Sequence, residues 1–173
     1  MVAAAWIQGA NVAAAKTYET RDAALARVFG ADAVVDRRTA FLTPAQVDSA
    51  QALAGARVEY PRVTYYVATR RDTLLGRAYL DTHIVRTLSE TLLIVVAPDG
   101  RTQSVDILAF DEPEDYLPPR RWLHALVDRT LSKRLRPGDA VDGISGATLS
   151  ARAATEAVRR VLAVDRVLHG ERR

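Results

Sequence analysis

A series of strand-forming runs joined by tight turns occupies the middle of the chain and constrains its fold most. Residues 63–67, 74–80, 91–96 and 102–110 are apolar, β-branched or alternating in character. Arg70-Arg71-Asp72 and Pro98-Asp99-Gly100 supply turns short enough for hairpins, and Gly76 marks a candidate bulge. Because strands joined by hairpins pair antiparallel, the sequence predicts an antiparallel, half-barrel-like sheet of at least four strands.

Helical patterns flank these strands on both sides. Residues 22–29 have apolar side chains at helical spacing before Gly30, and residues 33–42 alternate as a further strand. Thr43, Pro44 and Gln46 form a capping box that predicts a second helix, buried through Val47, Ala50, Leu53 and Ala54 and ended by Gly55. A short helix over 121–128 and a long one over 149–168 complete an α+β fold with flanking helices and a long C-terminal helix.

Length and composition predict one domain and exclude several kinds of site. The chain has 173 residues, of which 49% are hydrophobic, enough for a single core. It has no cysteine, which excludes disulfides and thiolate metal sites, and the sequence suggests no metal centre. With 24 basic and 21 acidic residues mixed along the chain, we expect no nucleic-acid partner.

The first fifteen residues are apolar and rich in alanine. Val12 to Ala15 has the small side chains of a signal-peptide cleavage site, so we expect export, with residues 16–173 as a single domain. The alternative is an N-terminal helix, since no basic residue precedes the run and Gln8 and Asn11 interrupt it. The run is too short to span a bilayer, and we expect no transmembrane segment in this chain.

The segment Asp142-Gly-Ile-Ser-Gly-Ala-Thr-Leu-Ser150 carries the clearest chemical signal. Its small residues let the backbone approach a ligand, and the N-terminus of the helix that follows favours a phosphate. No lysine follows the glycines, so this is not a Walker-type loop. The alternative is that Ser145 or Thr148 only caps the helix.

This segment resembles the flavinylation motif of the FMN-binding domain family, which includes flavin subunits of the sodium-pumping NADH:quinone reductase and of the Rnf complex. The resemblance is clearest over 60–165. It implies that a separate flavin transferase esterifies FMN through its phosphate to Thr148, outside the cytoplasm. The remaining motif positions would contribute to the cofactor site: Asp142, Ser145, Gly146, Ala147, Leu149 and Ser150.

The same resemblance implies an electron carrier that serves redox partner proteins in a membrane-associated complex, rather than a stand-alone enzyme. One loop departs from the family: its usual Glu-Thr-Pro-Gly is replaced here by residues 111–116. This departure leaves open how the flavin ring is covered.

Other candidate contacts to the flavin have structural alternatives. Trp122 and Tyr116 could form walls for the ring or belong to the core, and His83 could hydrogen-bond the flavin or be structural. Arg77 and Arg86 could favour anionic reduced flavin, or pair with Asp81 or Glu90. We expect His124 and His169 to be exposed, and the acidic residues of 111–115 to form a solvated connector.

Two other functions are compatible with these residues. One is a flavin reductase that acts on a small substrate with the same FMN, with His83 or Tyr116 as proton donor. The other is a partner-binding module without flavin that docks through Arg120-Arg121 and Arg159-Arg160. We assign no catalytic residue, and the chain has no Gly-x-Gly-x-x-Gly for a dinucleotide.

Overall fold

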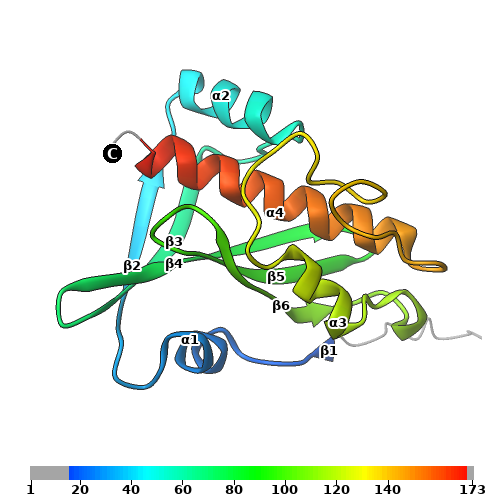
Figure 1. Ribbon diagram of the computed structural model, residues 1–173, viewed down its shortest axis with the longest axis horizontal. Helices are drawn as coiled ribbons and strands as arrows, with labels where there is room; N and C mark the ends of the chain where they lie inside the picture. The colour runs from blue at the N-terminus through cyan, green and yellow to red at the C-terminus, as the bar shows by residue number, and fades with distance from the viewer. Residues whose placement is uncertain (1–15, 171–173) are drawn as a thin grey trace, which may run out of the picture.

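A computed structural model describes residues 16–170 and contains one open antiparallel sheet (Figure 1). The strands lie in the order β1-β6-β5-β4-β3-β2, and every neighbouring pair is antiparallel. Their bounds are β1 Lys16–Thr17, β2 Val34–Phe41, β3 Arg62–Arg70, β4 Thr73–Ile84, β5 Ser89–Val96 and β6 Thr102–Phe110. The predicted antiparallel sheet in an α+β fold is confirmed. The expected cleavage site at residues 12–15 lies outside the described residues.

The helices cover both faces of this sheet unequally. Helices α2 (Pro44–Ala54) and α4 (Thr148–His169) pack against each other on one face, and α1 (Arg21–Phe29) lies on the other (Figure 1). Two 3-10 turns, η1 (Glu114–Tyr116) and η2 (His124–Leu126), flank the short helix α3 (Arg120–Leu123). Within residues 16–170, no helix is both long enough and apolar enough to cross a bilayer.

The predicted helix over 121–128 is shorter than expected. Regular α-helix ends at Leu123, and Val127 is already extended. The reason is the edge of β6: Thr102 donates its main-chain N–H to Arg129 O and accepts from Asp128 N. These bonds draw the chain out of the helix and along the sheet.

The capping box of α2 is formed as predicted. The Thr43 side chain accepts from Gln46 N, the Gln46 side chain accepts from Thr43 N at 2.9 Å, and Gly55 has the left-handed φ of 61°. Ala50 and Ala54 are buried, but Leu53 is 40% exposed, so its predicted burial is wrong. Since α2 meets α4 through small side chains, the buried stripe is too narrow to include Leu53.

The β3–β4 hairpin turns at Arg71 and Asp72, which both have positive φ, as a two-residue hairpin requires. Ala68 pairs with Gly76 and Thr69 with Leu74, which leaves Leu75 as the extra residue of a bulge beside Gly76. A Cβ on Gly76 would lie 2.9 Å from Val96 O. Glycine is therefore needed there for the close approach of β5.

A buried ion pair fixes α4 to the sheet. Arg77 on β4 donates to both carboxylate oxygens of Asp165, and the Tyr79 hydroxyl donates to the same carboxylate at 2.7 Å. All three side chains are buried. The position of α4 on the sheet is thus set by directional bonds as well as by apolar packing.

Candidate functional site

The motif forms the loop that enters α4, and Thr148 is the first residue of that helix. The N-cap is Ala147, and no side chain accepts a hydrogen bond from the first turn. Thr148 Oγ1 instead donates to Ile144 O at 3.1 Å. The alternative in which Ser145 or Thr148 merely caps the helix is therefore wrong, and the helix keeps the free N–H groups that favour an anion.

The motif presents some of its residues to solvent and buries others. Asp142, Ser145, Gly146 and Thr148 are exposed, and Leu149 is 50% exposed. Gly146 has φ +84° and open space around it, so glycine is required for its backbone conformation and not for room. The buried members are Ala147 and Ser150, and the Ser150 hydroxyl has no hydrogen-bond partner among the described residues.

Trp122 anchors the start of the motif from α3. Its side chain is 7% exposed and belongs to the core between the sheet and α4. Its Nε1 donates to Asp142 O at 2.6 Å. Trp122 is therefore part of the core, and its indole N–H holds the start of the motif loop in place.

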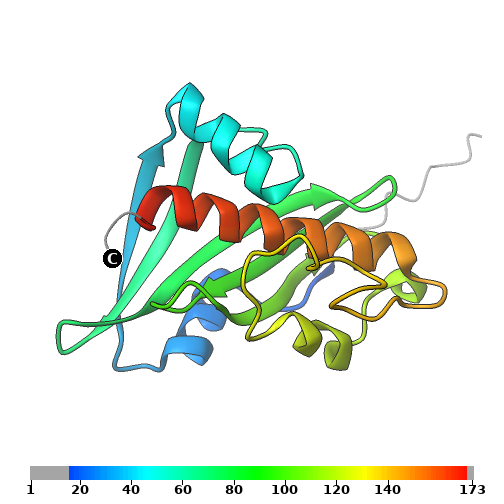
Figure 2. The ribbon, with the colours of Figure 1, turned by 45° about the horizontal axis from the view of Figure 1, so that its top comes forward.

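A cavity of about 470 Å3 opens beside Thr148. Figure 2 shows that the loop leading into α4 lies over the N-terminal half of the helix, and residues 135–137 of this loop form one wall. The other walls come from α4 and from Gly55 at the end of α2. Its charged lining residues are Arg136, Arg152, Glu156 and Arg159, so the cavity is net cationic.

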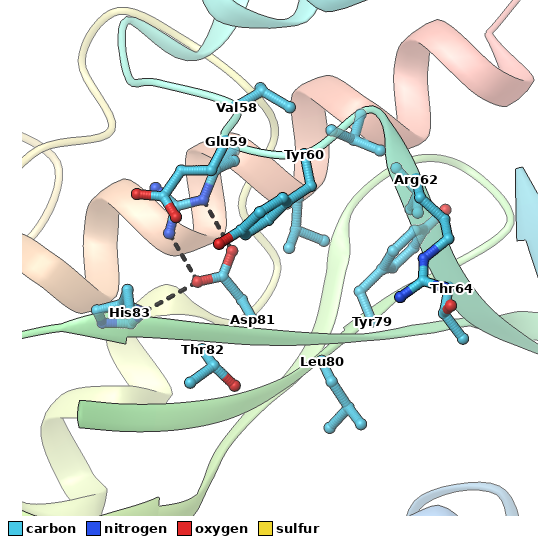
Figure 3. Close-up of a pocket in the computed structure, with 14 residues that line it drawn as sticks. Val58, Glu59, Tyr60, Arg62, Thr64, Tyr79, Leu80, Asp81, Thr82 and His83 are labelled. Carbon is cyan, nitrogen blue, oxygen red and sulfur yellow. Dashed lines mark hydrogen bonds and ion pairs between the residues drawn. The ribbon is translucent and has the colours of Figure 1, made fainter. Parts of the chain in front are cut away.

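His83 lies away from the motif, against the middle of α4 (Figure 3). Its Nδ1 is 2.9 Å from Asp81 and its Nε2 is 3.0 Å from Glu90. Arg160 holds Asp81 with two hydrogen bonds of 2.8 and 2.6 Å. Since Arg160 follows Thr148 by twelve residues, it lies roughly 18 Å further along the helix axis. The structure does not bring His83 together with Thr148.

The pKa values of His83, Asp81 and Glu90 depend on one another. Burial alone would lower the pKa of His83, but its bonds to Asp81 and Glu90 raise it to about 9. Burial opposes ionisation of Asp81 too, yet His83 and Arg160 lower its pKa to about 2. Glu90 is fully buried, and this burial raises its pKa. Sequence reasoning missed the cluster, although the 81/83 spacing on a strand places both residues on one face.

Several other candidates have structural partners. Arg77 pairs with Asp165 rather than with Asp81 or Glu90, and the Arg86 guanidinium lies 4.2 Å from the centre of the Tyr116 ring. His169 is half-buried and meets the Tyr65 ring edge-on, so its expected exposure is wrong.

The acidic connector is also not uniformly solvated. Glu112 is buried, and its Oε1 accepts from the main-chain N–H groups of Arg86, Thr87 and Leu88. Burial opposes its ionisation, but these three donors hold the pKa of Glu112 below its usual value. Glu112 therefore fixes the β4–β5 turn.

We compared the sequence with models of known protein families. Residues 89–163 match the family model described as an FMN-binding domain. The resemblance to the FMN-binding domain family is confirmed. The match to this family runs from β5 through most of α4 and includes the whole motif. A search of curated proteins and a search of solved structures each found no match.

The residues of the matched segment fit a phosphorylated flavin. An uncapped helix N-terminus, an exposed threonine hydroxyl and a cationic cavity meet at one place. These are groups that stabilise a phosphate, and the cavity offers room beside it. The match and the site together support a flavin-binding role with FMN as the cofactor.

Proposed function

We propose that this protein is an electron-transfer flavoprotein whose FMN is esterified through its phosphate to Thr148. The observation that carries the proposal is the position of the Thr148 hydroxyl. It is exposed, stands at the uncapped first turn of a 22-residue helix and borders a cationic cavity. It also occupies the acceptor position of a motif that lies within the segment matched to the FMN-binding domain family.

Each part of the motif has a distinct task in this proposal. Thr148 supplies the ester oxygen, and the N–H groups of the first turn of α4 stabilise the phosphate charge. Gly146 sets the left-handed backbone that leads into that turn. The Trp122 bond to Asp142 O holds the loop in place. When bound, the flavin supplies one- and two-electron redox chemistry, while the protein supplies attachment and surroundings.

The exposure of Thr148 and Leu149 suits two successive encounters with other proteins. A flavin transferase must reach the hydroxyl during maturation, and redox partners must approach the flavin afterwards. We place both encounters outside the cytoplasm, at the membrane surface, because the apolar residues 2–15 have the composition of an export signal.

The two other functions have less support. A flavin reductase needs a proton donor beside the ring, for which His83 and Tyr116 are the candidates. Both ring nitrogens of His83 are engaged by Asp81 and Glu90, and the Tyr116 ring lies against the Arg86 guanidinium. The partner-binding module would dock through Arg120-Arg121 and Arg159-Arg160. Arg120 and Arg121 are exposed, but Arg159 donates to Ala54 O and Arg160 donates to Asp81, so the second pair is not free.

The attachment is tested on a denaturing gel. The protein is co-produced with a flavin transferase in the periplasm of a host, and gel bands are viewed for flavin fluorescence. Wild type and Thr148→Ser should give a fluorescent band, because both keep a hydroxyl, and Thr148→Ala should give none. A fluorescent Thr148→Ala band would contradict attachment at this residue.

The electron-carrier role is tested separately on the purified flavoprotein. A carrier should be reduced once, and then reoxidised stoichiometrically by a one-electron acceptor protein. Sustained turnover of a small-molecule acceptor at comparable rates would instead favour the flavin reductase.

A further inference from the structure

The cavity beside Thr148 is a groove that follows one face of α4. Its lining residues on this helix are Thr148, Arg152, Thr155, Glu156 and Arg159. They recur at intervals of three or four residues, with Thr155 beside Glu156, which places them along one side of a helix. The row spans eleven residues, or roughly 16 Å along the axis. A long, narrow molecule attached at Thr148 can therefore lie along α4.

Positive charge is gathered at the far end of this groove, and Glu156 offsets it only in part. Within residues 16–170, neither Arg136 nor Arg159 forms an ion pair. Arg159 donates only to main-chain carbonyls, those of Ala54 and Leu135, and Arg136 donates to Lys133 O. Arg152, nearer to Thr148, is paired with Glu156 at 2.8 Å.

The fold maintains this arrangement at an electrostatic cost. Burial, together with the nearby charge of Arg136, lowers the pKa of Arg159, and the negative charge of Glu156 opposes this shift in part. Gly55 allows the approach of the guanidinium, since a Cβ at Gly55 would lie 3.0 Å from Arg159 Nη2. A bound anion would relieve the repulsion between the two arginines and would be stabilised by both.

We propose that the attached flavin lies along this groove and that Arg136 and Arg159 stabilise its anionic reduced form, which raises its reduction potential. This inference rests on the attachment of FMN to Thr148. In the redox step the oxidised flavin takes two electrons from a donor redox protein and one proton from solvent, which leaves one negative charge on the reduced ring. That charge is absent before reduction, so cations at the groove favour the product over the reactant.

The test is the reduction potential of the flavinylated protein and its charge variants, measured with a chemical reductant and a reference dye. Arg136→Gln and Arg159→Gln should each lower the potential. We expect about a tenfold shift toward oxidised flavin at a fixed potential, which is about 30 mV for a two-electron couple. Glu156→Gln removes a negative charge from the same groove, so it should raise the potential.

Opposite shifts of the reduction potential in the arginine variants and in Glu156→Gln would indicate an electrostatic effect. Loosened packing would not change the direction of the shift with the sign of the charge removed. Arg159 also holds the end of α2, but Arg136 donates its hydrogen bond within its own loop, to Lys133 O, so Arg136→Gln is the decisive variant. The matched control is Arg134→Gln, an exposed arginine of the same loop that does not line the groove and pairs with Asp139. Its potential should equal that of wild type.

Intact mass is recorded for every sample before titration. If Thr148 carries FMN but Arg136→Gln and Glu156→Gln leave the potential unchanged, or move it the same way, the groove assignment is overturned and the attachment stands. A protein that carries no flavin on Thr148, although the transferase modifies a known substrate, overturns both proposals.

Discussion

His83 lies between two carboxylates, and its charge is important for the fold. With its pKa raised to about 9, the ring is protonated at neutral pH and balances part of the negative charge of Asp81 and Glu90. In the unfolded chain the same ring has a pKa of about 6.5. The folded protein therefore binds this proton more tightly than the unfolded chain does.

This linkage gives the stability a defined dependence on pH. Because the folded pKa is the higher one, the contribution of His83 is fully present below pH 6.5 and is lost as the pH rises through about 9. Its upper limit is about 3 kcal/mol. Relative to His83→Gln, the free energy of unfolding of wild type in urea should therefore be higher at pH 6 than at pH 9.5. His124→Gln, at an exposed histidine, is the control. An equal difference at both pH values would show that the charge of His83 is not involved.

Glu112 is a second residue whose role is structural. One carboxylate oxygen accepts three main-chain N–H groups of the β4–β5 turn. Glu112→Ala should lower the free energy of unfolding by about 2 kcal/mol, since bonds to a charged acceptor are lost and the donors are left without it. Asp115→Asn, an exposed neighbour in the same loop, should leave unfolding unchanged. Equal effects of the two variants would refute this role.

At the scale of elements, α4 both carries the motif and closes the larger core. Its buried face packs on the sheet and on α2, and its N-terminus presents Thr148 to solvent. The Arg77–Asp165 pair sits near the other end of the helix, so attachment chemistry and anchoring are separated along one element.

Asp165→Asn tests the anchor of α4. Removing the charge leaves Arg77 buried without a counter-ion, which costs about 3–5 kcal/mol when a buried pair is broken. Thermal unfolding should show the loss. Glu156→Gln, which breaks the exposed pair with Arg152 on the same helix, should cost less than about 1 kcal/mol. A loss for Asp165→Asn as small as that for Glu156→Gln would show that the pair does not anchor the helix.

The elements that depend on local chemistry could be predicted from the sequence. The capping box at Thr43 and the hairpin turn at Arg71-Asp72 rely on residues within a few positions of one another. The short helix after Pro119 could not be bounded in this way, because bonds to Thr102, far away in sequence, end it. For the same reason the pairing of Arg77 with Asp165 depends on how α4 is placed on the sheet. By contrast, Asp81, a partner of His83, is only two residues away on the same strand.

At the scale of the whole molecule, one sheet separates two apolar cores within residues 16–170. The larger core lies under α2 and α4 and includes Trp122, and the smaller lies under α1. The motif stands at the edge of the larger core, where a rigid helix begins. The motif residues near Thr148 are contiguous in sequence, so the sequence alone places them together. Arg136 and Gly55 could not be placed there from the sequence, since the fold alone brings the loop and the end of α2 to the same groove.

The central claim is that Thr148 carries FMN, and peptide mass spectrometry tests it most directly. The protein is co-produced with a flavin transferase whose activity is confirmed on a known substrate, and its intact mass and digest are recorded. We predict a gain of one FMN less one water, located on Thr148 and absent from Thr148→Ala. An unmodified mass, or a flavin located on another residue, would contradict the account.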